Sequence, residues 1–241
     1  TVVVVGDKAD QIARAVGGRA ETVPQEPQLG TGHAVQHAQD TLTGFSGDVL
    51  VLYGDVPFVR AETMRSMLER LHGADEPACV VLGFEPADPG HYGRVIANNA
   101  GSISKMIEFK DASEEERACS LCNSGLLAAR SEDLFALLAR VSNDNAQSEY
   151  YLPDIVNIAI GDGRACAVVV CDDPGEVTGI NSRGELAAAE AAWQAARREA
   201  ALADGATLVA PETVFFSHDT RLGRDVMVEP NVVFGPGVTV A

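Results

Sequence analysis

The sequence predicts an α/β protein with a mostly parallel sheet, followed by a long helix and the start of a parallel β-helix. Up to about residue 180, short apolar runs alternate with amphipathic segments, which is typical of strands covered by helices. An Ala-rich segment at 184–203 then has helical composition and stops near Gly205. Val226, Val232 and Val238 recur at a spacing of six residues, and hexad repeats are typical of a parallel β-helix.

Strands are expected where short apolar runs are bounded by glycine, proline or polar residues. In chain order these runs are 1–5, 21–23, 49–53, 78–84, 124–129 and 165–171. Two further runs, 94–97 and 102–107, flank the tetrapeptide Asn-Asn-Ala-Gly, which predicts an antiparallel hairpin inserted into the sheet.

Helices are expected where apolar residues recur every three or four positions. In chain order these segments are 8–16, 33–42, 62–71, 132–141 and 184–203, and 150–160 is expected to be helical beyond Pro153. The segment 62–71 shows the pattern clearly, because Met64, Met67, Leu68 and Leu71 fall on one side of it.

Three parts follow from this order: a first domain at 1–182, a linker helix at 183–204 and the start of the β-helix at 205–241. The chain opens directly on a buried-type strand, and a parallel strand needs neighbours on both sides. We therefore expect this chain to be a piece of a longer protein whose natural N-terminus lies upstream. The hexads run to Ala241 and a solenoid needs several stacked coils, so we expect the second domain to continue as well.

Charge and cysteine usage narrow the class of partner. Lys plus Arg number 18 against 35 Asp plus Glu, a formal net charge of -17, which argues against nucleic acid because basic residues hold phosphate backbones. No apolar run approaches the roughly 18 residues of a membrane span, and no signal segment is recognisable. The five cysteines are odd in number and scattered, which favours a reducing cytoplasm. Cys119 and Cys122 are interpreted as core residues rather than as a zinc pair.

A carboxylate after the strand 49–53 is the first candidate for chemistry. Gly54 and Asp55 follow this strand directly, and Pro57 prevents it from continuing. In open α/β sheets ligands bind beyond the carboxyl ends of the strands, and a carboxylate there suits a Mg²⁺ that carries phosphate. From this stretch alone, an aspartate that caps the following helix is an equal alternative.

The loop 25–33, Gln-Glu-Pro-Gln-Leu-Gly-Thr-Gly-His, precedes a predicted helix. Gly30 frees the backbone, Thr31 can cap the helix, and exposed N–H groups at a helix start can hold an anion or the edge of a base. Gln25 has the amide donor and acceptor that the imide edge of a pyrimidine requires. Considered alone, the loop is better explained as a simple strand-to-helix turn.

Four further residues are candidates, three of them with a structural alternative. Gly93 lets a sugar ring approach the backbone, or marks a bend at a strand start. Glu108 accepts hydrogen bonds from sugar hydroxyls or is simply solvated, and Asn123 can bond an acyl-amino group. For Asn181, which precedes the long helix, a helix cap is the default interpretation, and it can also supply a carbonyl oxygen to a metal opposite Asp55. An aromatic-bearing loop at 143–151 is expected to lie over the pocket, with packing as the first alternative.

Seven motifs occur in order, and their combination resembles one enzyme family. They are Gln-x-x-Gln-Leu-Gly-Thr-Gly-His-Ala, Tyr-Gly-Asp-x-Pro, Tyr-Gly-Arg, Glu-x-Lys-Asp-Ala, Asn-Ser-Gly, Asn-x-Asn-Ala-Gln-x-Glu-Tyr-Tyr and Gly-Ile-Asn-Ser-Arg. With the long helix and the hexads, nearly the whole chain resembles the bifunctional bacterial N-acetylglucosamine-1-phosphate uridyltransferase / glucosamine-1-phosphate acetyltransferase, which makes UDP-N-acetylglucosamine.

The resemblance implies a Rossmann-like nucleotide-diphospho-sugar transferase domain, joined by the helix to a left-handed parallel β-helix. The full-length parent would be a cytoplasmic homotrimer. The residues implied to bind substrate are Gln25, Gly30 and Thr31 for uridine, Tyr53, Gly54 and Asp55 for the nucleotide–sugar junction, and Gly93, Glu108 and Asn123 for N-acetylglucosamine. Asp55 and Asn181 would coordinate Mg²⁺.

The implied reaction is attack by N-acetylglucosamine 1-phosphate on the α-phosphorus of UTP, which gives UDP-N-acetylglucosamine and releases pyrophosphate. It needs in-line positioning and charge neutralisation, with Mg²⁺ as Lewis acid and template. The family's Gly-rich loop with its Arg, the Lys that follows and the acetyltransferase residues do not occur in this sequence, and Ser124 stands where Thr is commoner. We therefore expect the 241-residue chain to be inactive, or nearly so, in uridylyl transfer.

Two other interpretations stay open at this point. One is a related nucleotidyltransferase of other base or sugar specificity, for which Gln25 and Asn123 are the discriminating residues, since they would read the uracil and the acetamido group. The other is a non-catalytic nucleotide-sugar-binding or scaffold protein that lacks the phosphate loop. The coding sequence upstream of Thr1 would separate it from the enzyme.

Overall fold

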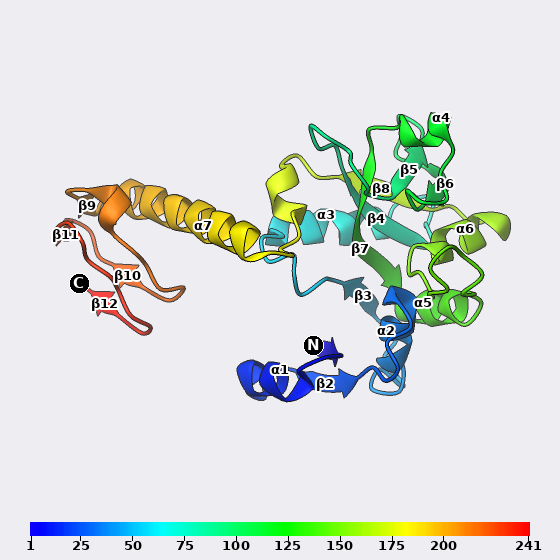
Figure 1. The fold of residues 1–241 in the computed structure, drawn as a ribbon, viewed down its shortest axis with the longest axis horizontal. Coiled ribbons are helices and arrows are strands. Elements are labelled where there is room, and N and C mark those ends of the chain that lie inside the picture. Colours follow the sequence, from blue (N-terminus) through cyan, green and yellow to red (C-terminus); the bar gives the residue numbers. More distant parts are fainter. The chain divides into compact units, whose positions relative to one another are not determined.

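The computed structural model describes residues 1–241, which form two compact units, 1–179 and 180–241. Figure 1 labels the elements of both. The strands of the first unit are β1 (Val2–Val5), β2 (Glu21–Pro24), β3 (Asp48–Val51), β4 (Cys79–Phe84), β5 (Arg94–Ala97), β6 (Ile103–Ile107), β7 (Cys122–Arg130) and β8 (Ala167–Val170). Its helices are α1 (Ala9–Val16), α2 (Thr31–His37), α3 (Ala61–Leu71), α4 (Glu114–Arg117), α5 (Ser131–Leu138) and α6 (Asp154–Gly161), with a 3-10 turn at Pro174–Val177.

Six strands of the first unit form one sheet in the order β6–β5–β7–β4–β8, with β3 also beside β7. β7 runs antiparallel to β3, β4 and β5, and β6 runs antiparallel to β5, whereas β4 and β8 are parallel. β3, β4, β5 and β8 therefore share one direction. The sequence predicts only one antiparallel part, the hairpin. That prediction is incomplete, because β7 also runs antiparallel to its neighbours. An apolar run carries no information about strand direction.

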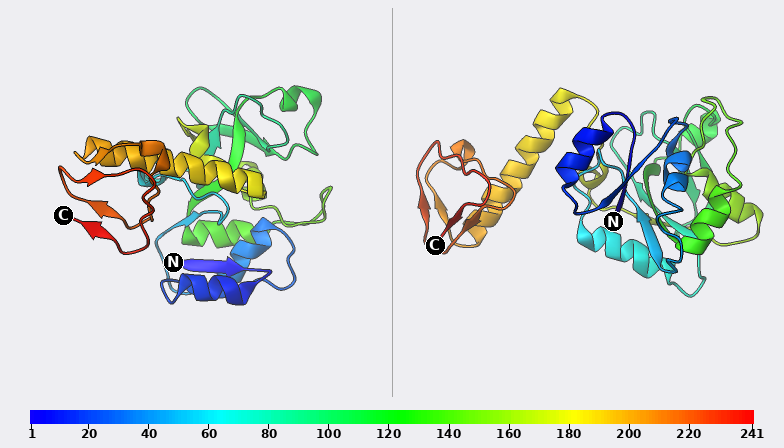
Figure 2. Two further views of the ribbon diagram at one scale, coloured as in Figure 1. Left: turned by 60° about the vertical axis from the view of Figure 1, so that its left-hand side comes forward. Right: turned by 90° about the horizontal axis from the view of Figure 1, so that it is seen from below.

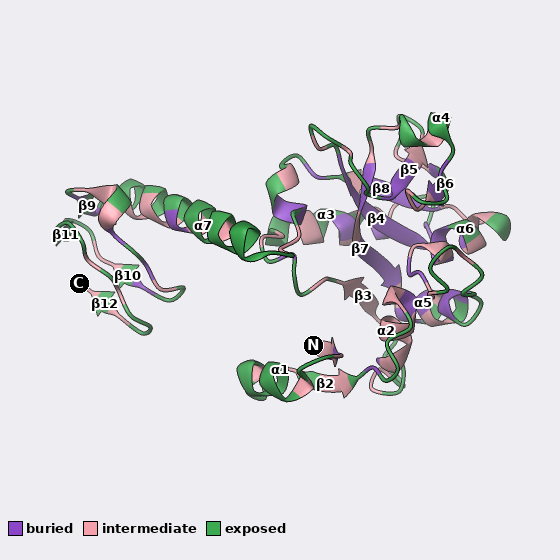
Figure 3. Cartoon of the chain, viewed as in Figure 1, coloured by how far each residue is buried: buried purple, intermediate pink, exposed green.

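The side chains of β4 divide the core between the two faces of this sheet. Cys79 and Val81 pack with residues of α5 and α6, whereas Val80, Leu82 and Phe84 pack with residues of α3. This alternation is the period of two that a β-strand imposes on its side chains. All six residues of β4 are buried (Figure 3), and helices cover both faces of the sheet (Figures 1 and 2).

β1 and β2 form a separate two-stranded parallel sheet, with Val2 opposite Glu21. α1 lies between them in sequence and ends at Gly17, whose φ of 59° is a left-handed conformation that glycine adopts without strain. The Gly17 N–H donates to the carbonyl of Ala13 and closes the helix. The strand–helix–strand order predicted for the first 23 residues is confirmed.

The second unit consists of a 21-residue helix, α7 (Arg183–Ala203), and four short strands. The strands are β9 (Thr207–Leu208), β10 (Arg221–Leu222), β11 (Met227–Val228) and β12 (Thr239–Val240), with a 3-10 turn at Pro211–Thr213. β9 pairs in parallel with β11, and β10 with β12. Asn231 donates to Thr213 and Gly237 to Asp219, each 18 positions back along the chain, which is the length of three hexads.

The expectations about membrane spans and cysteines can both be checked against the structure. No helix combines the length and the apolar character that crossing a membrane requires. All five cysteines are free thiols, and Cys122 is buried in the core as expected, whereas Cys119 is half-buried.

Candidate functional site

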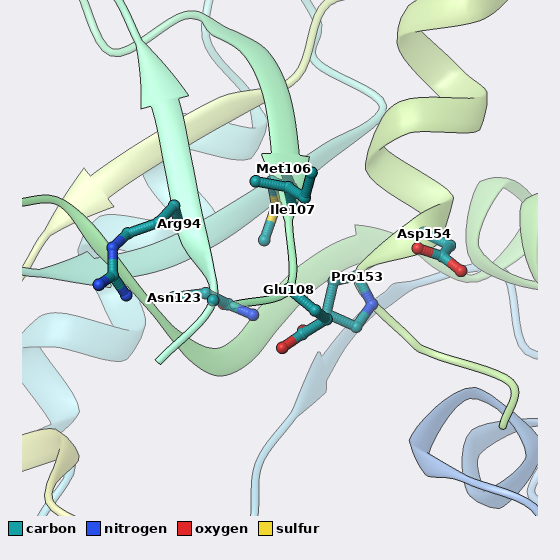
Figure 4. Close-up of a pocket in the computed structure, with 8 residues that line it drawn as sticks. Arg94, Met106, Ile107, Glu108, Asn123, Pro153 and Asp154 are labelled. Atoms are coloured by element: carbon teal, nitrogen blue, oxygen red, sulfur yellow. The ribbon is translucent and has the colours of Figure 1, made fainter. Parts of the chain in front are cut away.

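A pocket lies where β5, β6 and β7 approach the start of α6. It is lined by Gly93, Arg94, Met106, Ile107, Glu108, Asn123, Pro153 and Asp154. Figure 4 shows side chains from these separate segments gathered at one place. Three residues that the sequence assigns to sugar binding, Gly93, Glu108 and Asn123, are therefore neighbours in space.

Strand pairing brings these three residues together. Arg94 of β5 lies opposite the end of β6 and opposite Cys122 of β7, so the residues next to them in sequence fall side by side. The Asn123 N–H donates to the Gly93 carbonyl at 2.8 Å. A Cβ at position 93 would lie 3.2 Å from both carboxylate oxygens of Glu108, so the absence of a side chain keeps the space beside that carboxylate open.

One end of the Asn123 side-chain amide is hydrogen-bonded within the fold. Its Oδ1 accepts the Gly125 N–H at 2.9 Å, and the side chain is 9% exposed. The amide therefore offers N–H donors to a ligand, and an acyl oxygen is the matching acceptor. The neighbouring Ser124 donates its hydroxyl to the Leu82 carbonyl at 2.6 Å, a tether to the backbone that needs only a hydroxyl.

Carboxyl groups dominate the charge of the pocket. Burial raises the pKa of Glu108, and the carboxylates of Asp154 and Asp111 raise it further. Burial also raises the pKa of Asp154, again with a contribution from Asp111. The Tyr151 hydroxyl is buried without a hydrogen-bond partner, and burial, then Asp111 and Glu108, raise its pKa. Such groups suit a ligand with many hydroxyls, which both donate and accept hydrogen bonds.

Sequence reasoning missed Asp154, which lines this pocket, and assigned no binding role to Tyr151, whose pKa the pocket residue Glu108 influences. Tyr151 belongs to the aromatic loop expected over the pocket, but packing was the first alternative for it. Asp154 lies in the first turn of α6, where the positive end of the helix dipole already explains an acidic residue. The Glu-Tyr-Tyr motif was the one signal that pointed to this segment.

The loop before α2 holds a second group of predicted residues. The amide nitrogen of Gln25, Nε2, donates to the Gly30 carbonyl at 3.0 Å and lies 3.1 Å from Nδ1 of His33. Both amide hydrogens are engaged, so the expectation that Gln25 offers a donor together with an acceptor is corrected: only Oε1 remains. Thr31 does not cap α2, because Gly30 occupies the N-cap position, and its Oγ1 accepts the Leu152 N–H at 3.0 Å instead.

The backbone at 150–152 holds this loop in place. Tyr150 accepts the Gly32 N–H at 2.7 Å and donates its own N–H to the loop at 2.8 Å. A Cβ on Gly30, whose φ is 110°, would lie 2.7 Å from the Tyr150 carbonyl oxygen. The same segment continues into α6 at the pocket, so one stretch of chain joins the two groups of predicted residues.

Tyr53, two residues beyond β3, connects the two groups. Burial raises the pKa of its phenol to about 12, the Thr31 side chain opposes this rise, and the carboxylates of Glu108 and Asp55 add to it. Tyr53 therefore lies close to residues of the loop, the pocket and the turn after β3. A Cβ on Gly125, whose φ is 86°, would lie 2.4 Å from the Tyr53 ring, so only glycine lets the ring rest against β7.

Gly54 and Asp55 are exposed in the turn after β3. α3 begins only at Ala61, with Arg60 at its N-cap position, so the helix-capping alternative for Asp55 is wrong. An exposed carboxylate at the end of a sheet strand is free to meet a cation that carries phosphate.

Asn181 lies in the second unit, directly before α7. Ser182 caps this helix: its Oγ accepts the Glu185 N–H at 3.1 Å, and the Glu185 carboxylate accepts the Asn181 N–H at 2.6 Å. The capping alternative for the Asn181 side chain is therefore wrong. No group of three or more His, Cys, Asp or Glu side chains is arranged to hold a metal, and joint coordination of Mg²⁺ by Asp55 and Asn181 stays a prediction. A Mg²⁺ held by one carboxylate and by substrate phosphates needs no such group.

Comparison with known proteins places this chain in a family. Residues 1–206 match the family model described as the MobA-like NTP transferase domain. The chain belongs to the MobA-like NTP transferase family. The match covers the whole first unit and all of α7. The chain is therefore a nucleotidyltransferase, as the motifs predict.

Two curated relatives of this NTP transferase are called bifunctional protein GlmU. The one from Novosphingobium aromaticivorans is 71% identical over 234 residues, which are 97% of this chain and 52% of the relative. The one from Zymomonas mobilis is 53% identical over 244 residues, or 100% and 54%. The chain spans about half the length of the curated relatives it matches. The resemblance inferred from the seven ordered motifs is confirmed.

Solved structures share the fold of this NTP transferase. A UDP-glucose pyrophosphorylase complexed with UDP-glucose has a TM-score of 0.58 at 16% identity and covers 80% of each chain. A putative glucose-1-phosphate thymidylyltransferase from Bacillus anthracis, in complex with a sucrose, has a TM-score of 0.58 at 17% identity and covers 78% of this chain and 73% of that one. They confirm the α/β nucleotidyltransferase fold.

Proposed function

We propose that this chain carries the site for uridylyl transfer from UTP to N-acetylglucosamine 1-phosphate, which gives UDP-N-acetylglucosamine and pyrophosphate. The observation that carries the proposal is the convergence of Gly93, Glu108 and Asn123 in one pocket, with Tyr53 between that pocket and the loop that bears Thr31. The name of the relatives, bifunctional protein, supports a second activity in the full-length parent. The motif resemblance suggests that this activity is acetylation of glucosamine 1-phosphate from acetyl-CoA.

The pocket would read the acetamido sugar through hydrogen bonds of both polarities. Asn123 presents N–H donors for the acyl oxygen, because its own oxygen is already bound to Gly125. Glu108 presents acceptors for sugar hydroxyls, and Gly93 leaves the space in which those hydroxyls would lie.

The nucleotide would lie between the loop and the turn after β3. Gln25, Gly30 and Thr31 would bind the uridine, and Gly54 would leave room for the backbone to approach it. Tyr53 and Asp55 would line the junction between nucleotide and sugar, which fits the contribution of the Asp55 carboxylate to the raised pKa of Tyr53.

Asp55, together with Asn181, would hold a Mg²⁺. When bound, the ion neutralises charge on the phosphates. The residues of the chain would align the sugar phosphate with the α-phosphorus of UTP, so that one O–P bond forms while the bond to pyrophosphate breaks. This transfer requires no covalent nucleophile, and we assign none.

The second unit would begin a left-handed parallel β-helix at 205–241, with the helix at 183–204 as a linker and 1–182 as the transferase domain. The parallel strand pairs and the bonds that return to the chain 18 positions earlier support this assignment. The homotrimer expected for the full-length parent would form through this part.

Calorimetric titration with UDP-N-acetylglucosamine and UDP-glucose tests the proposal, because the two ligands differ at the acetamido group. Asn123→Asp keeps the acceptor for the Gly125 N–H but replaces the N–H donors by a carboxylate oxygen. We expect it to weaken binding of UDP-N-acetylglucosamine roughly tenfold while UDP-glucose is little affected. Asn99→Asp, in the exposed hairpin turn, controls for the added charge.

The outcomes separate the competing interpretations. Equal affinity of the wild type for both ligands would favour a related nucleotidyltransferase of other sugar specificity. No binding of either ligand by the folded protein would favour a scaffold. Turnover of UTP with N-acetylglucosamine 1-phosphate can be measured alongside, but little is expected from these 241 residues, so binding is the sharper readout.

A further inference from the structure

His33 belongs to the Gly-Thr-Gly-His motif, yet the proposed function gives it no role. It lies on α2, one turn before His37, and it faces Gln25. The Nε2 atom of Gln25 is 3.1 Å from Nδ1 of His33, and the Nε2 atoms of His33 and His37 are 3.3 Å apart. A neutral imidazole donates at one nitrogen and accepts at the other, so this series of contacts has a direction.

The Gly30 carbonyl decides that direction. Its oxygen can only accept, and it lies 3.0 Å from the amide nitrogen of Gln25, so the NH₂ end of the amide faces it. The same nitrogen can only donate to Nδ1 of His33, which must therefore be unprotonated. The proton of His33 then sits on Nε2 and is donated to His37.

The surroundings of His33 favour the neutral form of the ring and hold it in place. Burial lowers the pKa of His33, and the neighbouring His37 lowers it further. The Tyr150 ring stacks on the imidazole with 6.0 Å between the ring centroids. Gln25 is itself buried, and its Oε1 accepts no hydrogen bond within the protein.

We propose that His33 is a positioning residue that fixes the Gln25 carboxamide so that Oε1 alone faces the base. An acceptor there matches a base with an N–H on its pairing edge, such as the imide of uracil. It repels cytosine, whose corresponding ring nitrogen is an acceptor. His33 thereby sets a preference for uridine over cytidine nucleotides. The inference rests on the proposed function, which places the base at Gln25.

The first test needs no ligand and follows the Gln25 side-chain amide by NMR. His33→Leu removes the acceptor, and we expect at least one Gln25 amide hydrogen to exchange with water roughly fivefold faster. His33→Asn restores an acceptor near the position of Nδ1 and should rescue the slow exchange. His37→Leu, one turn along the same helix, is the matched control and should leave Gln25 unchanged. Nitrogen chemical shifts of the wild-type ring should show Nδ1 unprotonated, and a protonated Nδ1 would overturn the inference without any variant.

The second test is base preference, measured as the ratio of the Kd values for CDP-N-acetylglucosamine and UDP-N-acetylglucosamine. The wild type should favour the uridine nucleotide, and His33→Leu should reduce this ratio roughly fivefold, while His33→Asn and His37→Leu retain it. A folded His33→Leu protein with the wild-type ratio overturns the inference and leaves the proposed function standing. If neither nucleotide perturbs the Gln25 amide of the wild type, the placement of the base fails and the inference falls with it.

Discussion

The surroundings of the Glu108 carboxyl group disfavour its charged form. Burial, Asp154 and Asp111 raise its pKa above the value it has in the unfolded chain. The folded protein therefore binds this proton more tightly than the unfolded chain does. The charge lowers the free energy of unfolding as the pH rises through the raised pKa, and this loss is absent below the unfolded value of about 4.3.

Glu108→Gln removes the charge and retains the shape of the side chain. We expect the variant to be more stable than the wild type at pH 7 and equally stable at pH 4, as measured by urea unfolding. Glu115→Gln, on the exposed face of α4, is the control and should show no such difference between the two pH values. If Glu108→Gln is instead the less stable protein at pH 7, the fold favours the charged form.

The N-terminus of α3 is capped by a residue that is 116 positions away in sequence. Arg60 occupies the N-cap position without a capping side-chain bond. Glu176, which is 5% exposed, accepts the Arg60 N–H at 3.0 Å and the Thr63 hydroxyl at 2.7 Å. A carboxylate at this end of a helix is also favoured by the helix dipole. This contact fastens the segment 174–177 to the helix.

Removing this carboxylate should weaken the whole first unit. Glu176→Ala leaves two partly buried donors, the Arg60 N–H and the Thr63 hydroxyl, without this acceptor, and we expect a loss of about 2–3 kcal/mol in the free energy of unfolding. Glu62→Ala, in the exposed first turn of the same helix, should change it by less than about 0.5 kcal/mol. Urea denaturation of both variants checks the difference, and equal losses would show that Glu176 is not a cap.

The loop before α2 depends on a glycine that two separate constraints require. Gly30 has a φ of 110°, and its missing side chain admits the Tyr150 backbone. Gly44 has a φ of 81° but has nothing within 4 Å of an added Cβ. The pair therefore separates backbone strain from the steric clash.

We expect Gly44→Ala to cost about 1 kcal/mol, the strain of a left-handed alanine. Gly30→Ala should cost at least about twice as much, because the Tyr150 backbone must also move. Thermal unfolding measures both, and titration with UDP-N-acetylglucosamine should show weaker binding for Gly30→Ala alone. Equal losses in the two variants would mean that the backbone at 150–152 moves away from the added Cβ at no energetic cost.

On the scale of the whole molecule, each unit has a core of its own. The second unit buries Leu208, Val214, Phe216 and Val228 together. Gln194 on α7, which is 3% exposed, holds this core to the helix: its Nε2 donates to the Phe216 carbonyl at 2.9 Å and its Oε1 accepts the Phe216 N–H at 2.9 Å. The Gln194 amide thus forms with Phe216 the two backbone hydrogen bonds that a neighbouring strand would otherwise supply.

Gln194→Leu should therefore destabilise the second unit and spare the first. It leaves both backbone groups of Phe216 unpaired, so we expect faster hydrogen exchange throughout 205–241 and a local loss of about 2 kcal/mol. Amides of β4 should keep their protection. Glu199→Gln, exposed on the same helix, is the control. Faster exchange in β4 would show that the two units unfold together.

Most elements could be predicted because their signals are local. The run predicted at 78–84 corresponds to β4 at 79–84, and the Ala-rich segment predicted at 184–203 corresponds to α7 at 183–203. Both could be predicted because the periodicity of buried positions can be read from neighbouring residues. The direction of β7 and the cap of α3 could not be predicted. Both depend on contacts between residues far apart in sequence.

The order of motifs in the sequence was sufficient to predict the family and to select Gly93, Glu108 and Asn123, which the fold then gathers into one pocket. Only the tertiary structure decided which atoms of the selected residues remain for a ligand. Each donor or acceptor engaged within the fold is withdrawn from binding, so Gln25 keeps only its oxygen and Asn123 only its N–H groups. Residue type alone cannot reveal this, because a side-chain amide can turn either end toward a ligand until its neighbours fix it.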